Sequence, residues 1–410
     1  LNGTIFSGGL YQYDRNGTPQ LYLAAASPTI SNDRKTWTFK IRADARFSNG
    51  MPVTAADFKY GMMRTMNPHL KPAVSWAQSY DSGILGAADY IAGKTHDVTG
   101  IQVVDAHTIR FVLATPIPNL PYVLAIIPNM PVPAAVYAKY TPDEATIHPI
   151  GAGPYMLQSW QRGNQAVLAR NPYYFRKDRP YVDKITAYEN EKPSVVTLRI
   201  QKGEVDGFGN DQEVAASDVQ SLSNDPRYRN YILTAPSAAV TWLDLNVKAH
   251  PLDNLKIRQA IAMAIDRVRL VQLLGGNAYA AYQMYIPLDT QHDPALDAQH
   301  SAYPYNPQKA AALVTSSGYD HKPITLLFGN DQSYFAGMAP GLQQMLQQIG
   351  LNVNLRGVSY TSLLGLTAPA SGHQIDTELW SMDYPDGIDI YQGAMNCAQN
   401  AAGAYSGAKY

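Results

Sequence analysis

Two aspartates three residues apart have the most suggestive spacing for chemistry in this chain. Asp383 and Asp386 enclose Tyr384 and Pro385. Paired carboxylates can act as a general acid and a general base. Across a proline, however, the same spacing is typical of a turn whose carboxylates accept hydrogen bonds from backbone amides. Because the sequence shows no partner base or nucleophile, a hydrolase that uses this pair is kept only as an alternative.

Other patterns for catalysis and metal binding fail on their spacing. Gly151 and Gly153 could begin a dinucleotide-binding loop, but Pro154 follows them and a third glycine is missing. The nine histidines are scattered without a His-Glu-x-x-His pair. The single Cys397 excludes an internal disulfide framework. We therefore expect no enzyme activity, no cofactor and no metal ion.

The last third of the chain, which contains the two aspartates, has an α/β pattern. Alternation and helical periodicity predict three strands and two helices, over residues 240–246, 324–328 and 353–358 and over about 253–265 and 338–349. A strand, a helix and a strand in succession favour an α/β domain.

The first third of the chain is predicted to mix strands with one long helix. Thr54 and Asp57 have the spacing of a capping box, so a helix should begin there and end before Pro68. The apolar stretch 120–136 is broken by four prolines and is expected to form loop and strand. Further strands are predicted at residues 37–42, 101–105, 108–113, 166–169 and 185–188.

Composition limits the partners. A net charge of −1 without a Lys/Arg run argues against nucleic-acid binding. No stretch approaches the ~20 apolar residues of a membrane span. The 28 tyrosines suit a wet binding surface, because each offers a ring and a hydroxyl, but they are equally common in ordinary exported domains.

Six segments in order resemble family 5 of the extracellular solute-binding proteins of ABC importers, the peptide and nickel class. They are residues 36–58, 149–155 with 169–174, 203–206, 257–266, 305–310 and 383–386. The resemblance implies an α/β, two-lobed periplasmic-binding-protein-like fold with an extra small domain and a hinge-closing cleft.

The same resemblance implies a division of the chain. Residues 1–148 would be mainly the small extra domain, 149–237 would belong to lobe I and 238–410 to lobe II. Family members have further segments before the position of Leu1 and after that of Tyr410, so we expect the sequence to be truncated at both ends.

Ligand-binding residues are also implied by the resemblance. In peptide-binding members an aspartate at the position of Asp383 pairs with the terminal ammonium of the ligand. The remaining candidates are Trp380, Ser381 and Tyr384 beside it, Trp242 and Asn246 on a strand, and Gly8, Gly9 and Leu10 near the hinge. For Asp383 the alternative is a turn cap, for the two tryptophans core packing, and for the glycine segment a plain turn.

The implied function is that of a substrate-binding component that captures short peptides and delivers them to the transmembrane subunits of an ABC permease. We expect a monomeric, periplasmic or extracellular protein, with lipid anchoring left open. Alternatives within the fold are a nickel chelate, an oligosaccharide, haem or another metabolite as ligand. A transport-independent signalling or adhesion receptor is a further alternative.

Overall fold

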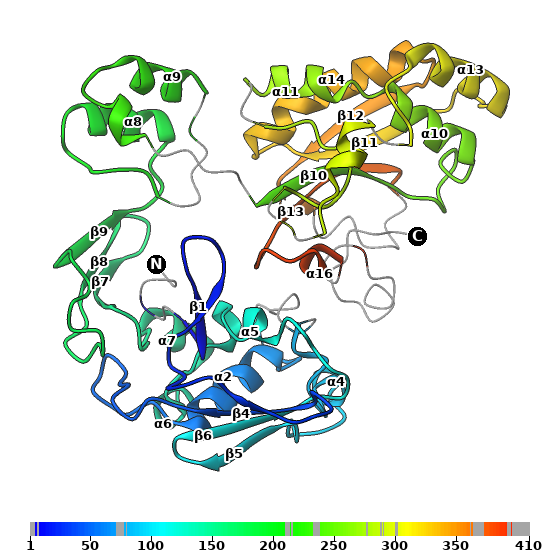
Figure 1. Ribbon diagram of the computed structural model, residues 1–410. Coiled ribbons are helices and arrows are strands. Elements are labelled where there is room, and N and C mark those ends of the chain that lie inside the picture. The colour runs from blue at the N-terminus through cyan, green and yellow to red at the C-terminus, as the bar shows by residue number, and fades with distance from the viewer. Residues whose placement is uncertain are drawn as a thin grey trace. The chain divides into compact units, whose positions relative to one another are not determined.

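The computed structural model divides into two compact units, Leu1–Glu191 and Lys192–Tyr410, which are described separately (Figure 1). The structure describes residues 5, 8–70, 78, 80–209, 214, 216–232, 238–275, 278–287, 289, 291–299, 302–360, 362–363, 373–391 and 395. Within these residues no helix is both long and apolar enough to cross a bilayer. The domain boundaries expected after residues 148 and 237 stay predictions.

Unit 1 contains an antiparallel sheet in the order β3-β4-β6-β5. Its strands are β3 Thr29–Ile30, β4 Thr36–Lys40, β5 Ile101–Asp105 and β6 Thr108–Val112. Alternation on β4 buries Trp37 and Phe39, and the Phe39 ring meets Phe111 of β6 edge to face at 6.0 Å. The predicted strand and hairpin are therefore confirmed. A short pair, β1 Tyr11–Tyr13 and β2 Pro19–Leu21, lies in the same unit.

Helix α2, Ala55–Met66, begins and ends where the sequence predicts. The backbone N–H of Thr54 donates to Oδ2 of Asp57 at 2.8 Å, and the Thr54 hydroxyl donates to the same oxygen at 2.6 Å. Oδ1 of Asp57 also accepts from the backbone N–H of Ala134 at 3.0 Å. The capping acid thus ties the start of the helix to a segment far along the chain.

The prediction of loop and strand for residues 120–136 is wrong. Three short helices lie there, α5 Leu120–Val123, η1 Ile127–Asn129 and α6 Ala134–Tyr137. Pro121 and Pro128 occupy the first turns of α5 and η1. A proline fits a first turn, because the N–H that it lacks would have no helical partner there. The described part of unit 1 also contains the helices α4 Ala87–Ile91 and α7 Pro142–Ile147.

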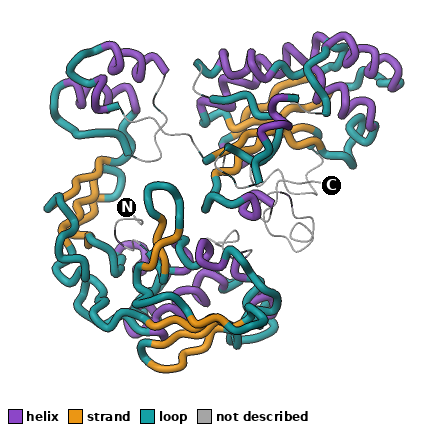
Figure 2. Tube along the Cα trace, viewed as in Figure 1, coloured by secondary structure: helices purple, strands orange, loops and turns teal. Residues whose placement is uncertain are grey.

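A three-stranded antiparallel meander completes unit 1. It consists of β7 Tyr155–Gln161, β8 Gln165–Arg170 and β9 Lys184–Tyr188, drawn as adjacent orange segments in Figure 2. The predicted strands 166–169 and 185–188 are confirmed. Gly153 precedes a strand instead of opening a helix, so this segment lacks the strand–loop–helix context of a dinucleotide-binding loop.

Unit 2 is built on a mixed sheet in the order β10-β13-β11-β12. The strands are β10 Ala239–Leu245, β11 Ile324–Gly329, β12 Val353–Val358 and β13 Ile375–Ser381. β11 pairs in parallel with β12, as expected of a β-α-β unit, whereas β10 and β13 are antiparallel. The predicted strands are confirmed.

Helices of unit 2 cover one face of this sheet (Figure 1). They are α10 Leu255–Ala264, α11 Arg267–Leu273, α13 Pro307–Ser317 and α14 Ser333–Gln348. Helix α14 begins at Ser333 instead of near residue 338, since Phe335 in its first turn is fully buried in the core. The unit also contains α8 Pro193–Gln201, α9 Ala216–Asn224, η2 Arg229–Tyr231, α12 Pro294–Ala298 and α16 Gly387–Ile390.

Candidate ligand-binding site

Trp380, near the end of β13, lies in the core of unit 2. It stands opposite Val240 of β10 and packs in a cluster with Ile286 and Ile390, with 7% of its surface exposed. Its indole Nε1 donates a hydrogen bond to Oδ2 of Asp389 at 2.6 Å. Core packing, one of the two alternatives for this residue, is therefore observed, while a ligand contact stays a prediction.

The start of the loop after β13 is held by hydrogen bonds of two successive backbone N–H groups. The backbone N–H of Met382 donates to the carbonyl of Ala238 at 2.7 Å. The N–H of Asp383 points to Oδ2 of Asp389 at 3.3 Å, the oxygen that also receives the indole hydrogen bond. Asp389 is completely buried. One buried carboxyl group therefore fixes both the strand end and the loop.

Asp386 caps helix α16. Its Oδ1 accepts from the backbone N–H of Ile388 at 2.9 Å, and the N–H of Gly387 donates to Oε1 of Gln291 at 2.8 Å. A Cβ at position 387 would stand 2.6 Å from the Tyr285 ring, so any larger residue would force that ring to shift. The prediction that Asp386 is a structural turn acid is confirmed.

The three candidates beside Trp380 differ in exposure. Ser381 is exposed, Asp383 is half-buried and Tyr384 is 1% exposed. Tyr384 therefore packs in the interior, whereas Ser381 and Asp383 present surface on a loop whose backbone is fixed. The predicted ligand contacts of these residues stay predictions.

The two candidates on and just after β10 are engaged in hydrogen bonds within unit 2. The indole Nε1 of Trp242 donates to Oδ1 of Asp244 at 2.8 Å. Nδ2 of Asn246 donates to the carbonyl of His373 at 2.8 Å, and its Oδ1 accepts from the N–H of Lys248 at 3.1 Å. Asn246 thus fastens the end of β10 to the segment before β13. Ligand contacts remain predictions for both residues.

Gly8, Gly9 and Leu10 belong to unit 1, where tight packing explains their small or apolar side chains. A Cβ at Gly9 would stand 2.4 Å from the carbonyl oxygen of Leu124, which no side chain tolerates. Leu10 is 1% exposed and belongs to the main core of the unit. A shared site of these residues with Asp383 of unit 2 stays a prediction.

A group of three buried acids on β10 and β13 escaped the sequence analysis. Carboxylate oxygens of Asp244, Asp376 and Glu378 lie within 4.8 Å of one another, and Nε2 of His373 lies 2.8 Å from Oδ1 of Asp376. The available signal was a pair of acids at alternate positions of β13, Asp376 and Glu378, which places both on one face, where Asp244 of β10 stands opposite Asp376. Oxygen ligands of this kind suit hard divalent cations.

The acid group also affects a nearby tyrosine. Burial, with the charge of Glu378 as the lesser cause, raises the pKa of Tyr360 to about 12. The phenol of Tyr360 therefore stays protonated throughout the neutral range.

Comparison with known proteins agrees with this architecture. The model of the bacterial extracellular solute-binding proteins, family 5, matches residues 18–402. A Brucella ovis protein named for peptide binding in ABC transport is 28% identical over 83% of this chain and 61% of its own length. The periplasmic oligopeptide-binding protein OppA of Salmonella typhimurium is 26% identical over 97% of this chain and 73% of its own.

A solved structure gives the fold. OppA of Burkholderia pseudomallei superposes with a TM-score of 0.79 at 24% identity, over 98% of this chain and 79% of the solved chain. The predicted α/β, two-lobed periplasmic-binding-protein-like fold is confirmed. This chain spans about 61% of the length of the Brucella relatives that it matches. The chain belongs to the bacterial extracellular solute-binding proteins of family 5.

Proposed function

We propose that this chain binds short peptides as the substrate-binding component of an ABC importer. The observation that carries the proposal is the family match over residues 18–402, because it extends through both units. The relatives at 25–28% identity are named for peptide or oligopeptide binding. In this proposal the protein lies outside the cytoplasm and passes the bound peptide, chemically unchanged, to a permease in the membrane.

Asp383 is our candidate for the group that binds the ammonium end of the peptide. Its half-buried position reduces solvent screening, so an ion pair there would be stronger than one on an open surface. The Asp389 carboxyl group holds the backbone of Asp383 in place, which lowers the entropy lost on binding. Desolvation offsets part of the gain, so the pair would supply register and selectivity more than affinity.

The alternative from another class, a hydrolase using Asp383 and Asp386, is disfavoured by the position of the second acid. Asp386 accepts a backbone hydrogen bond at the start of α16. A carboxylate engaged in a cap is a poor choice for a group that must gain and lose protons during a reaction. The binding function therefore accounts better for this pair.

Native mass spectrometry of the purified chain is the first test. We expect a mixture of short peptides to co-purify and to remain intact on incubation. A single metabolite or metal chelate would contradict peptide binding, and steady conversion of added peptide would support the hydrolase.

The role of Asp383 is tested with a matched pair of isosteric changes. We expect Asp383→Asn to weaken a free-amine peptide by about tenfold in calorimetry, the size of one lost charge-assisted hydrogen bond. Binding of the N-acetylated peptide should change little. Asp386→Asn is the control, since asparagine is also a good N-cap. Equal losses for both peptides would remove Asp383 from this role.

A further inference from the structure

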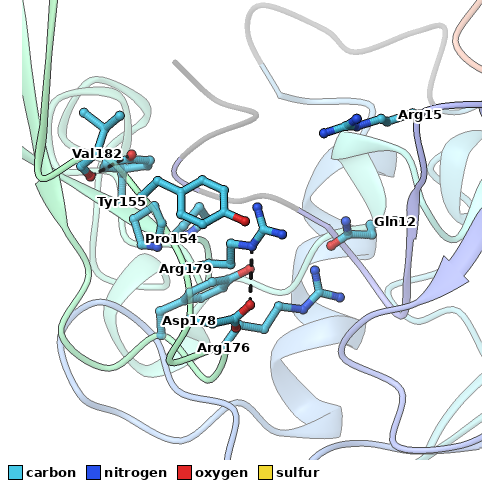
Figure 3. A pocket seen from close by; sticks show the side chains of 11 residues that line it. Gln12, Arg15, Pro154, Tyr155, Arg176, Asp178, Arg179 and Val182 are labelled. Atoms are coloured by element: carbon cyan, nitrogen blue, oxygen red, sulfur yellow. Dashed lines mark hydrogen bonds and ion pairs between the residues drawn. The ribbon is translucent and has the colours of Figure 1, made fainter.

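An open cavity of about 770 Å³ with a cluster of charged side chains lies entirely within unit 1. The β1–β2 hairpin, the start of β7 and the loop before β9 line it (Figure 3). Its charged lining consists of Arg15, Arg176, Arg179 and Asp178. Three arginines against one aspartate give the cavity a formal excess of positive charge, although the whole chain has a net charge of −1.

The guanidinium groups point into one space. Figure 3 shows the ends of Arg15, Arg176 and Arg179 directed toward the middle of the cavity from different sides, with the Gln12 amide facing the same space. Arg179 forms an ion pair with Asp178 at 3.4 Å. The convergence of cations in a concave site favours an anion, since field lines are focused by the surrounding protein.

Aromatic rings hold two of these arginines in position. The guanidinium of Arg176 lies 4.9 Å from the centre of the Tyr22 ring and 5.5 Å from that of Phe175. The guanidinium of Arg179 lies 4.1 Å from the centre of the Tyr181 ring. Stacking occupies the flat face of a guanidinium and leaves the N–H groups at its edge available to bind an oxyanion. The site is thus partly preorganised.

Gln12 adds a second kind of contact. Its Oε1 is buried and has no hydrogen-bond partner among the residues that the structure describes. A buried amide oxygen without a partner is costly, and a ligand N–H or O–H would satisfy it. The hydroxyl of Tyr155, in contrast, already donates to the carbonyl of Val182 at 2.9 Å.

We propose that this cavity binds a small organic anion, a carboxylate or phosphate ester. Arg15 and Arg176 contact the oxyanion, and Gln12 accepts a hydrogen bond from a donor group of the ligand. The proposal is independent of the peptide function, because it involves only residues of unit 1. A volume of 770 Å³ is within the usual range for small-molecule sites.

Calorimetry of the whole chain with phenyl phosphate and with benzoate, at low ionic strength, tests the proposal. We expect Arg15→Gln and Arg176→Gln each to weaken the better ligand by about tenfold, as the loss of one charge-assisted contact would. Arg162→Gln is the matched control, since Arg162 also stacks on a ring of unit 1, that of Trp160 at 5.1 Å, but does not line the cavity. Binding should also weaken as salt is raised.

The outcomes separate clearly. Binding of phenyl phosphate alone identifies a phosphate site, and binding of benzoate alone identifies a carboxylate site. The proposal is overturned if neither ligand binds at millimolar concentration, or if Arg162→Gln weakens binding as much as Arg15→Gln. If Arg176→Gln fails to fold, the exposed Arg15 still decides the result.

Discussion

Each unit contains a completely buried aspartate, Asp81 in unit 1 and Asp389 in unit 2, and the two carboxyl groups differ in the hydrogen-bond donors around them. Asp389 accepts from the indole of Trp380 at 2.6 Å and is approached by the N–H of Asp383 at 3.3 Å. Asp81 accepts from Nδ2 of Asn129 at 3.0 Å, and its Oδ2 has no hydrogen-bond partner within the described residues.

The difference shows that neighbouring donors, and not burial alone, decide what a buried carboxyl group does. Burial raises the pKa of Asp81 to about 7, and the hydrogen bond from Asn129 opposes this rise only in part. Asp81 therefore changes charge near neutral pH. Asp389 is instead used as an acceptor that fastens two segments of unit 2.

Removal of the unit 2 acceptor should have the largest effect. Asp389→Ala leaves the buried indole N–H of Trp380 and the half-buried N–H of Asp383 without their acceptor and creates a cavity, so we expect the free energy of unfolding to fall by about 5 kcal/mol. Urea denaturation followed by circular dichroism measures the change. Asp389→Asn keeps one acceptor oxygen and should lose about half as much. A loss below ~1 kcal/mol for the alanine variant would show that this carboxyl group is not an anchor.

Replacing the buried acid of unit 1, Asp81, should stabilise the chain at high pH, whereas replacing Asp389 destabilises it. With a folded pKa near 7 and an unfolded pKa near 3.8, the folded chain holds one more proton in between. The contribution of Asp81 to the free energy of unfolding is fully present below pH ~4. As the pH rises toward 7 this contribution is lost, and the free energy of unfolding falls by up to about 4 kcal/mol. Asp81→Asn should remove this dependence and be the more stable chain at pH 8. Denaturant midpoints at pH 4.5 and 8 test this, and equal pH slopes for both chains would refute it.

The smallest change in the free energy of unfolding is expected for Trp380, the donor in the hydrogen bond to Asp389. Trp380→Phe keeps an apolar ring in the core but loses the indole N–H, and we expect a loss of about 2 kcal/mol. In the Asp389→Asn background the same change should cost less, because the two residues share one hydrogen bond. Strictly additive losses would mean that the contact contributes no coupling energy.

The sequence was informative where local chemistry decides the structure. The capping box of Thr54 and Asp57 and the alternation on β4 both fix structure through residues a few positions apart. Arg258 and Asp266 have structural roles of the same local kind. Arg258 donates to the carbonyl of Leu252 at 2.7 Å, and Asp266 caps α11. These roles can be recognised because they use neighbours in the chain.

The features that were missed depend on distant segments. In the sequence Asp389 is an acid in a short apolar run. Its structural role depends on the fold, which brings the indole N–H of Trp380 to its carboxyl group. The group of Asp244, Asp376 and Glu378 requires β10 to pair with β13 in the observed register. The cavity arginines come from the β1–β2 hairpin and from the loop before β9. Single-sequence periodicity contains no information on such pairings.

The place of β13 in its sheet has a consequence for synthesis. β13 lies between β10 and β11, yet it follows both of them, and also β12, along the chain. While the nascent chain emerges from the ribosome, facing edges of β10 and β11 therefore stay open until residues 375–381 appear. Unpaired strand edges invite association with other chains. We expect this unit to depend on chaperone protection until β13 has been synthesised, and to fold slowly because the pairing spans over a hundred residues.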